Sequence, residues 1–173
     1  MINVYGDIML IKIATAECFT HGNIAKEIHS YSMGYPTTYQ WNLDENKVEL
    51  SVVAGLFIPT ITGVKTILQF EPLTPKETIN DIKVYNQEDD LAMADKMAEA
   101  VKKLTGADIG IGTTAGIGEG GIAVHGNETV AIGTSDVYAD LTNIDNELIF
   151  KRESFGIDNA LGMLELVISK DFY

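Results

Sequence analysis

Apolar and polar positions follow two different periods along the chain. Residues 8–16 are almost continuously apolar, which is typical of a strand buried on both faces of a parallel sheet. Residues 48–58 and 108–113 are further strand candidates. Residues 88–105 instead carry apolar side chains at helical spacing, with acids in the first turn, lysines in the last and Gly106 as the cap. Alternating elements of these two kinds predict an α/β fold with helices packed on a mixed, largely parallel sheet.

Weaker patterns complete the predicted order of elements. A helix is expected from Ile24 to a C-cap at Gly34, and a last helix is expected from an N-cap at Ser154 onward. Residues 60–70 fit a turn followed by a short helix or strand. The other expected strands are 79–85, a hairpin of 122–125 and 128–138, and 148–151. Because no linker or repeat separates these elements, residues 1–173 are predicted to form one domain, with residues 1–7 as an extra edge strand or a loose arm.

Composition narrows the classes of function. The chain has 173 residues, 46% of them apolar, and 12 Lys and Arg against 25 Asp and Glu give a net charge of −13. That charge argues against binding to nucleic acid or to an anionic membrane surface. The first apolar run is shorter than the roughly 20 residues that span a bilayer. A single Cys cannot form an internal disulfide, which favours a reducing cytoplasm. With no cluster of His and Cys, no metal is expected.

Cys18 follows the first predicted strand, at the turn into a helix. Ligands of open α/β sheets bind at the carboxyl ends of strands, beside helix N-termini. A free thiol is only about 3% ionised at neutral pH, and a helix starting after Gly22 would favour its thiolate. Cys18 is therefore either a nucleophile or a small buried hydrophobic residue. His21 and Lys65 are weaker candidates, each either an aid to catalysis or a solvated side chain.

A second candidate is the glycine-rich loop, residues 112–121. It contains Gly112, Gly116, Gly118, Gly120 and Gly121 together with Thr113 and Thr114. Such a loop lets the backbone approach a ligand and point N–H groups at a phosphate or carboxylate. It lacks the Gly-Lys-Ser/Thr of a Walker loop, and a hairpin rather than a helix follows it, unlike a dinucleotide-binding fingerprint. The alternative is a tight structural turn.

These segments resemble the CinA C-terminal domain, the nicotinamide mononucleotide amidohydrolase family. That family has a motif similar to Thr15-Ala16-Glu17-Cys18-Phe19-Thr20-His21-Gly22, in which Cys18 takes the place of the catalytic Ser. Lys65 falls near the family's catalytic Lys, whereas the Tyr before that Lys is replaced at about Thr60. The family's glycine loop and a later motif are similar to residues 114–121 and 150–153. The resemblance implies a CinA-like fold and, as one possible activity, an amide hydrolase.

A narrower resemblance is to the UPF0254 family of methanogenic archaea. It rests on residues 14–22, on Ile24-Ala25-Lys26-Glu27-Ile28-His29 and on the later Gly-Thr-Thr-Ala-Gly-Ile-Gly segment. It implies a protein of iron-guanylylpyridinol (FeGP) cofactor biosynthesis for Fe-hydrogenase, which binds guanylylpyridinol as its ligand. It also implies that Cys18 forms a thioester with the pyridinol carboxylate after an adenylating partner enzyme, HcgE, has activated that group.

The predicted site therefore centres on Cys18, with Lys65, His21 and Thr20 in support. The residues expected to bind the ligand are Thr15, Glu17, Gly22, Thr113, Thr114, Ala115, Gly116, Ile117, Gly118, Gly120, Gly121 and Arg152. No cofactor is expected to remain permanently bound, and we expect a cytoplasmic homo-oligomer. Because a thioester must survive water, a closed pocket is expected. A third interpretation is a nucleotide-binding or carrier protein that forms no covalent bond.

Overall fold

Five strands form one central sheet in the computed structural model, which describes residues 8–173. Their order is β2-β1-β5-β7-β8. The strands span Met9–Glu17 (β1), Val48–Phe57 (β2), Ile109–Thr114 (β5), Gly121–His125 (β7) and Val130–Gly133 (β8). β1 pairs in parallel with β2 and β5, whereas β7 and β8 continue the sheet antiparallel. The predicted mixed α/β class is confirmed. The expected strand or arm at residues 1–7 lies outside the described residues.

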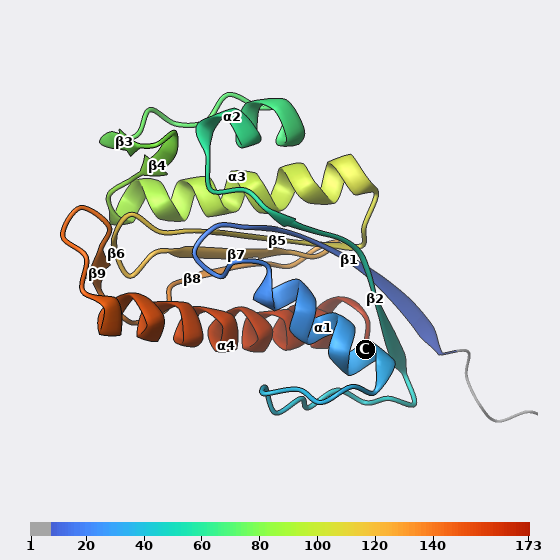
Figure 1. Ribbon diagram of the computed structural model, residues 1–173. Coiled ribbons are helices and arrows are strands. Elements are labelled where there is room, and N and C mark those ends of the chain that lie inside the picture. The colour runs from blue at the N-terminus through green and yellow to red at the C-terminus, as the bar shows by residue number, and fades with distance from the viewer. Residues whose placement is uncertain (1–7) are drawn as a thin grey trace, which may run out of the picture.

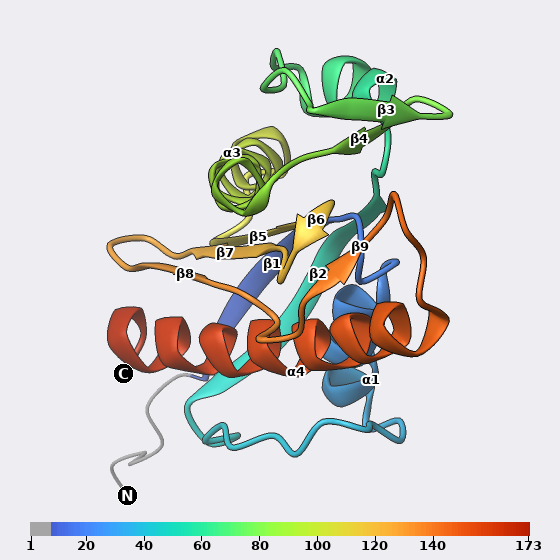
Figure 2. The same ribbon diagram turned by 90° about the vertical axis from the view of Figure 1, so that its left-hand side faces the viewer.

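Helices cover both faces of this sheet (Figures 1 and 2). α3 (Gln87–Thr105) packs on one face, and α1 (Asn23–Met33) and α4 (Asn146–Asp171) pack on the other. Side chains of β1 contribute to the hydrophobic core on both faces of the sheet. Ile11 and Ile13 lie in the core between the sheet and the helices α1 and α4. Ala14 and Ala16 lie in the core between the sheet and α3. The predicted burial on both faces therefore holds for Ile13 to Glu17 but not for the start of the run, where Met9 and Leu10 are 46% and 50% exposed. None of the helices in residues 8–173 has the length and apolar character needed to cross a membrane.

Small residues bring α3 close to the sheet. Ala94 and Ala98 of α3 pack against Ala123 of β7. A Cβ atom added at Gly112 of β5 would collide with the backbone of α3 at Ala94 and Ala98. This glycine of the glycine-rich loop therefore serves close helix-to-sheet packing rather than contact with a ligand.

The region between β2 and α3 differs from the predicted single strand at 79–85. Residues 60–70 form a short helix, α2 (Ile61–Gly63), continued by a π-helical turn, η1 (Val64–Leu68). Two short strands follow, β3 (Glu77–Ile79) and β4 (Ile82–Val84). Asn80 and Asp81 between them have left-handed φ values of 51° and 67°. Asn and Asp tolerate that conformation, so the chain reverses within the apolar run.

The end of the chain also differs from the prediction. α4 begins at Asn146, so the strand predicted at 148–151 and the N-cap predicted at Ser154 are both wrong. Asp145 is the N-cap, and its Oδ1 accepts the Glu147 and Leu148 amides at 3.0 and 3.2 Å. The second hairpin strand, β8, is shorter than predicted. After it the chain turns through Asp136, which has a left-handed φ of 63°, and reaches β9 (Ala139–Asp140), which pairs with β6 (Ile117–Gly118).

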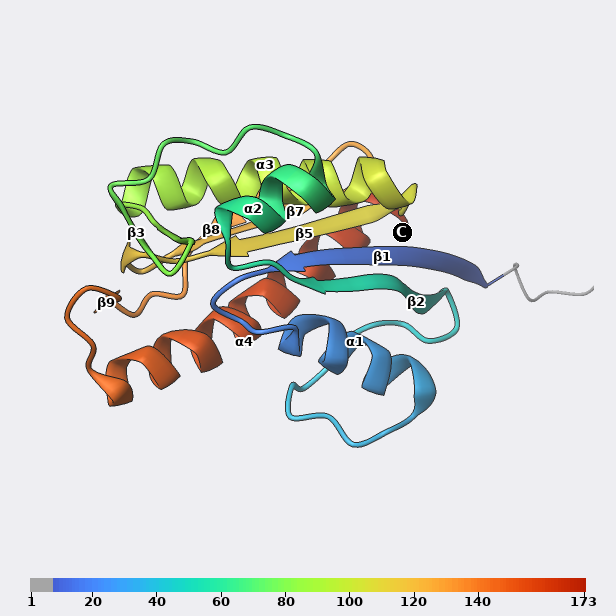
Figure 3. The same cartoon turned by 45° about the horizontal axis from the view of Figure 1, so that its top comes forward.

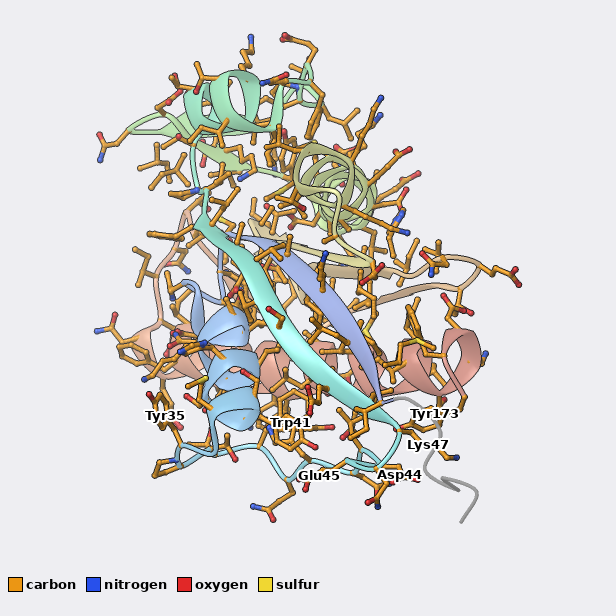
Figure 4. All side chains as sticks on the ribbon, turned by 90° about the vertical axis from the view of Figure 1, so that its right-hand side faces the viewer. Tyr35, Trp41, Asp44, Glu45, Lys47 and Tyr173 are labelled. Atoms are coloured by element: carbon orange, nitrogen blue, oxygen red, sulfur yellow. The ribbon has the colours of Figure 1, made fainter. Side chains whose placement is uncertain are left out.

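The connection from α1 to β2 is packed by aromatic rings at the amino ends of β1 and β2 (Figure 4). Trp41 stacks on Tyr31 with 4.6 Å between the ring centroids. The Lys47 ammonium lies 4.8 Å from the centroid of Tyr173, near the end of the chain. This cluster anchors the end of the sheet opposite to Cys18.

Candidate functional site

Cys18 lies directly after β1, where the chain leaves the middle of the sheet and turns towards α1 (Figure 3). Its side chain is buried, with 6% of the residue exposed. Its amide donates to both the carbonyl and the hydroxyl oxygen of Thr113, at 3.0 and 3.2 Å. The carboxyl ends of β1 and β5 therefore meet at Cys18. Open α/β sheets bind their ligands at this edge, beyond the carboxyl ends of the strands.

Glu17 fixes the Cys18 turn from inside the protein. The Glu17 carboxylate is fully buried and accepts four hydrogen bonds. The donors are the hydroxyls of Thr15 and Thr20, at 2.9 and 2.7 Å, and the amides of Ile24 and Ala25, at 3.2 and 3.0 Å. Burial raises the pKa of Glu17, and these four donors act against that rise.

The first amides of α1 all have acceptors in the protein. Those of Ile24 and Ala25 donate to Glu17, Asn23 donates to the Thr20 carbonyl at 2.9 Å, and Lys26 donates to the Gly22 carbonyl at 3.1 Å. These amides are therefore not free to donate to a Cys18 thiolate, because the Glu17 carboxylate is the anion that accepts two of them.

His21 stands next to this turn with its ring fixed on both sides. It has a left-handed φ of 53°, and its Nδ1 lies 2.9 Å from the Glu153 carboxylate on α4. The ring also packs edge-on against Phe57, with 5.4 Å between centroids. Lys65 lies apart from this group, on η1, where its ammonium pairs with the exposed carboxylate of Glu71 at 2.8 Å.

The glycine-rich loop is held from α3 and β4. The Gly116 amide donates to Asp90 at 2.7 Å, and the Ile117 amide donates to the Tyr85 carbonyl at 2.8 Å. The Glu119 amide donates to the side chain of Gln87 at 2.6 Å. Three amides of this segment therefore have partners within the protein.

Ala115 follows directly after β5 and is only 1% exposed. Two residues before it, the Thr113 carbonyl accepts the Cys18 amide at 3.0 Å, so Ala115 begins the loop next to the point where β5 meets the Cys18 turn.

Arg152 links α4 to the same loop. Only 2% of the residue is exposed, and its Nη1 donates to the carbonyls of Gly116, Gly118 and Ala139 at 3.1, 2.9 and 2.9 Å. Its guanidinium carbon lies 5.9 Å from the ring centroid of Phe19, the residue after Cys18. Burial lowers the pKa of Arg152, while the negative charge of Asp90 opposes that change.

The comparisons with known proteins agree with this arrangement of elements. The family model described as "FeGP cofactor biosynthesis protein HcgF" matches residues 10–168. The chain belongs to the HcgF family. An HcgF-family relative, a UPF0254 protein of Methanothermobacter thermautotrophicus (strain Winter), is 54% identical over 159 residues, covering 92% of this chain and 96% of that protein. A UPF0254 protein of Methanocorpusculum labreanum is 50% identical over 153 residues, covering 88% and 89%.

Among solved structures, the architecture of this HcgF-family chain is similar to that of a CinA-superfamily protein from Escherichia coli. The TM-score is 0.50 at 17% identity, over 90% of this chain and 79% of that chain. At that identity the likeness shows a shared fold and nothing about activity. The predicted CinA-like fold is confirmed.

Several buried polar residues of this HcgF-family site were not predicted. Gln87 and Asp90 lie in the first turn of α3, where acidic and polar residues are common at any helix start. Lys83 is also fully buried, and its ammonium donates to the Ile58 and Pro59 carbonyls, both at 3.1 Å. Hydropathy alone cannot separate such residues from solvated ones. Within residues 8–173 no group of three or more His, Cys, Asp or Glu is arranged to hold a metal ion.

Proposed function

We propose that this HcgF-family protein binds guanylylpyridinol and carries its pyridinol acyl group as a thioester on Cys18. Membership of the HcgF family supports a role in FeGP cofactor biosynthesis. The observation that carries the thioester proposal is the position of Cys18. It lies at the carboxyl edge of the sheet, it is buried and hydrogen-bonded to β5, and the next residue, Phe19, lies against the Arg152 guanidinium.

The proposed reaction is one acyl transfer from an adenylate. The Cys18 sulfur attacks the carbonyl carbon of the activated carboxylate, a C–S bond forms, and the bond from that carbon to the AMP oxygen breaks. AMP leaves with the electron pair, and we assign the thiol proton to His21, whose Nδ1 is already held by Glu153. A thiolate suits this step because it is a strong nucleophile near neutral pH and the thioester stays activated for later chemistry.

Backbone and side-chain donors support binding of an anionic acyl ligand despite the net charge of −13. The Ala115 amide is the donor that we assign to the oxygen of the reacting carbonyl. Arg152 supplies a buried positive charge on the other side of the Cys18 turn. Activation by HcgE and assembly into a homo-oligomer remain predictions, as does contact between the ligand and Thr114, Gly118, Gly120 or Gly121.

Intact-protein mass spectrometry tests the proposal. Protein incubated with guanylylpyridinol, ATP and the adenylating enzyme is expected to gain the ligand mass less one water, and hydroxylamine should remove the addition. Because the sequence contains one Cys, the adduct can be assigned to Cys18 and should be absent from Cys18→Ala.

Three outcomes separate the alternatives. An equal adduct on Cys18→Ala contradicts the thioester. Ligand binding without any adduct in either protein indicates a carrier. Release of ammonia from nicotinamide mononucleotide, lost in Cys18→Ala, indicates an amide hydrolase of the CinA type.

A further inference from the structure

Asp90 is a fully buried acid behind the glycine-rich loop. Its Oδ2 accepts the Gly116 amide at 2.7 Å. Its Oδ1 is buried without a hydrogen-bond partner in residues 8–173, and so is the neighbouring Thr114 hydroxyl. A buried acid whose hydrogen bonds are incomplete needs an explanation, because such a group costs the fold stability.

Positive charges from two elements face Asp90. Arg152 approaches from α4 and Lys83 from β4, and both favour its ionised form, as does the Gly116 amide. Tyr85, at the end of β4, also faces it, since the charge of Asp90 contributes to the raised pKa of that phenol. Burial outweighs all the favourable partners and raises the pKa of Asp90 to about 6.

The sign of this shift makes the charge unfavourable for folding. A carboxyl whose pKa is higher in the folded than in the unfolded state binds protons more tightly when folded. Its ionisation therefore lowers stability as the pH rises from about 4 to about 6, and the loss persists at neutral pH. A charge kept under such conditions is typical of a functional group rather than a purely structural one.

We propose that Asp90 is a positioning residue, whose charge fixes the glycine-rich loop and Arg152 in the arrangement that receives the ligand. Asp90 holds the amide of Gly116, while Arg152 holds the carbonyl of the same residue at 3.1 Å. The negatively charged Asp90 and the positively charged Arg152 thus both form hydrogen bonds with the backbone of Gly116. An uncharged side chain of the same shape keeps the hydrogen bond but leaves Arg152 without its counter-charge. The loop arrangement stands on its own, and only its use in ligand binding rests on the proposed function.

The substitution Asp90→Asn tests the charge separately from the shape. Asparagine can still accept the Gly116 amide, and its NH2 group can donate to the Thr114 hydroxyl. We expect a higher Tm than the wild type at pH 7.5 and no such gain at pH 4. We also expect amide hydrogen exchange of residues 114–121, corrected for intrinsic rates, to be about tenfold faster at pH 7.5.

The half-buried neighbour Asp89 supplies the matched control. Asp89→Asn should slightly lower the Tm, because it removes an acid from the helix N-terminus without touching the loop, and exchange of residues 114–121 should be unchanged. In the wild type, exchange of the loop should speed up as the pH falls from 7.5 to 5, whereas in Asp90→Asn it should not change with pH.

A lower Tm for Asp90→Asn at pH 7.5, or unchanged loop exchange, would show that Asp90 is only a structural hydrogen-bond acceptor. Thioester formation gives a separate readout. If the wild type forms the adduct, Asp90→Asn should form it at least tenfold more slowly. If the wild type forms none, the proposed function fails, while the Tm and exchange results still decide the role of Asp90 in the loop.

Discussion

Glu17 shows how one residue can determine the geometry of its neighbour. Its two carboxylate oxygens join the hydroxyls of Thr15 and Thr20 to two amides of α1, so the chain on both sides of Cys18 is fixed by one group. Thr20 also bonds to the Thr113 hydroxyl at 2.9 Å, which extends the network to β5. Glu17 therefore acts on Cys18 by positioning it.

Replacing Glu17 by Gln is expected to destabilise the protein. Each carboxylate oxygen of Glu17 accepts one backbone amide and one hydroxyl. In Gln one of these oxygens is replaced by an NH2 group, which is itself a donor, so the amide that faces it loses its acceptor. We expect the free energy of unfolding to fall by about 1–3 kcal/mol in urea denaturation. Glu71→Gln, at an exposed ion pair, is the control and should change it by less than about 0.5 kcal/mol. Equal stabilities for the two variants would contradict the role given to Glu17.

The sequence predicts part of this cluster. Motif resemblance finds Cys18, Thr20 and Arg152, and the glycine pattern finds Thr113, and the structure brings these four residues to one edge of the sheet. Asp90 is missed because its burial depends on the loop packed over it. Such long-range packing leaves no periodic pattern in the sequence.

At the scale of elements, the contact between α3 and β5 depends on the absence of side chains. The backbone of α3 occupies the space that a Cβ at Gly112 would need. Some glycines of this segment, such as Gly112, allow close packing of α3 on the sheet, whereas others belong to the loop itself. Their number alone could not show which served which purpose.

The substitution Gly112→Ala is expected to push α3 away from the sheet. We expect a loss of about 3 kcal/mol or more in the free energy of unfolding, because backbone atoms cannot move aside cheaply. Gly34→Ala is the matched control, because its added methyl meets no atom and its left-handed φ of 70° costs only about 1 kcal/mol. Denaturant titration of both variants measures the difference. A smaller loss at Gly112 than at Gly34 would show that the packing is not tight.

The start of α4 is the clearest failure of prediction at this scale. Leu148 and Phe150 are exposed on the first turns of the helix, by 39% and 68%. Assignment of secondary structure from hydrophobic periodicity assumes that apolar side chains are buried. A short apolar run that is exposed on a helix is therefore assigned wrongly as a strand. The Asp145 cap lies directly before this run, so the run belongs to the helix from its first turn.

For the whole molecule, the net charge of −13 opposes the approach of an anionic ligand, whatever the donors inside the site. Salt screens this long-range repulsion over a Debye length of about 10 Å at 0.1 M. The association rate of guanylylpyridinol should therefore rise about twofold to fivefold between about 0.02 and 0.3 M NaCl. Stopped-flow fluorescence measures it, with uncharged guanosine as the control. A rate that falls with salt would mean that the local positive charge around Arg152 dominates.

The hydrogen bond between Cys18 and Thr113 joins residues 95 positions apart, and Arg152 comes later still. A ribosome adds about 5–20 residues per second, so the thiol emerges roughly 5–20 s before its partner strand exists. During that interval the nascent chain presents an unprotected sulfur to every electrophile and oxidant in the cell. Folding of the chain onto β5 then leaves the residue only 6% exposed. Pairing of β1 with β5, 95 residues later in the chain, is therefore the folding event that shelters this thiol.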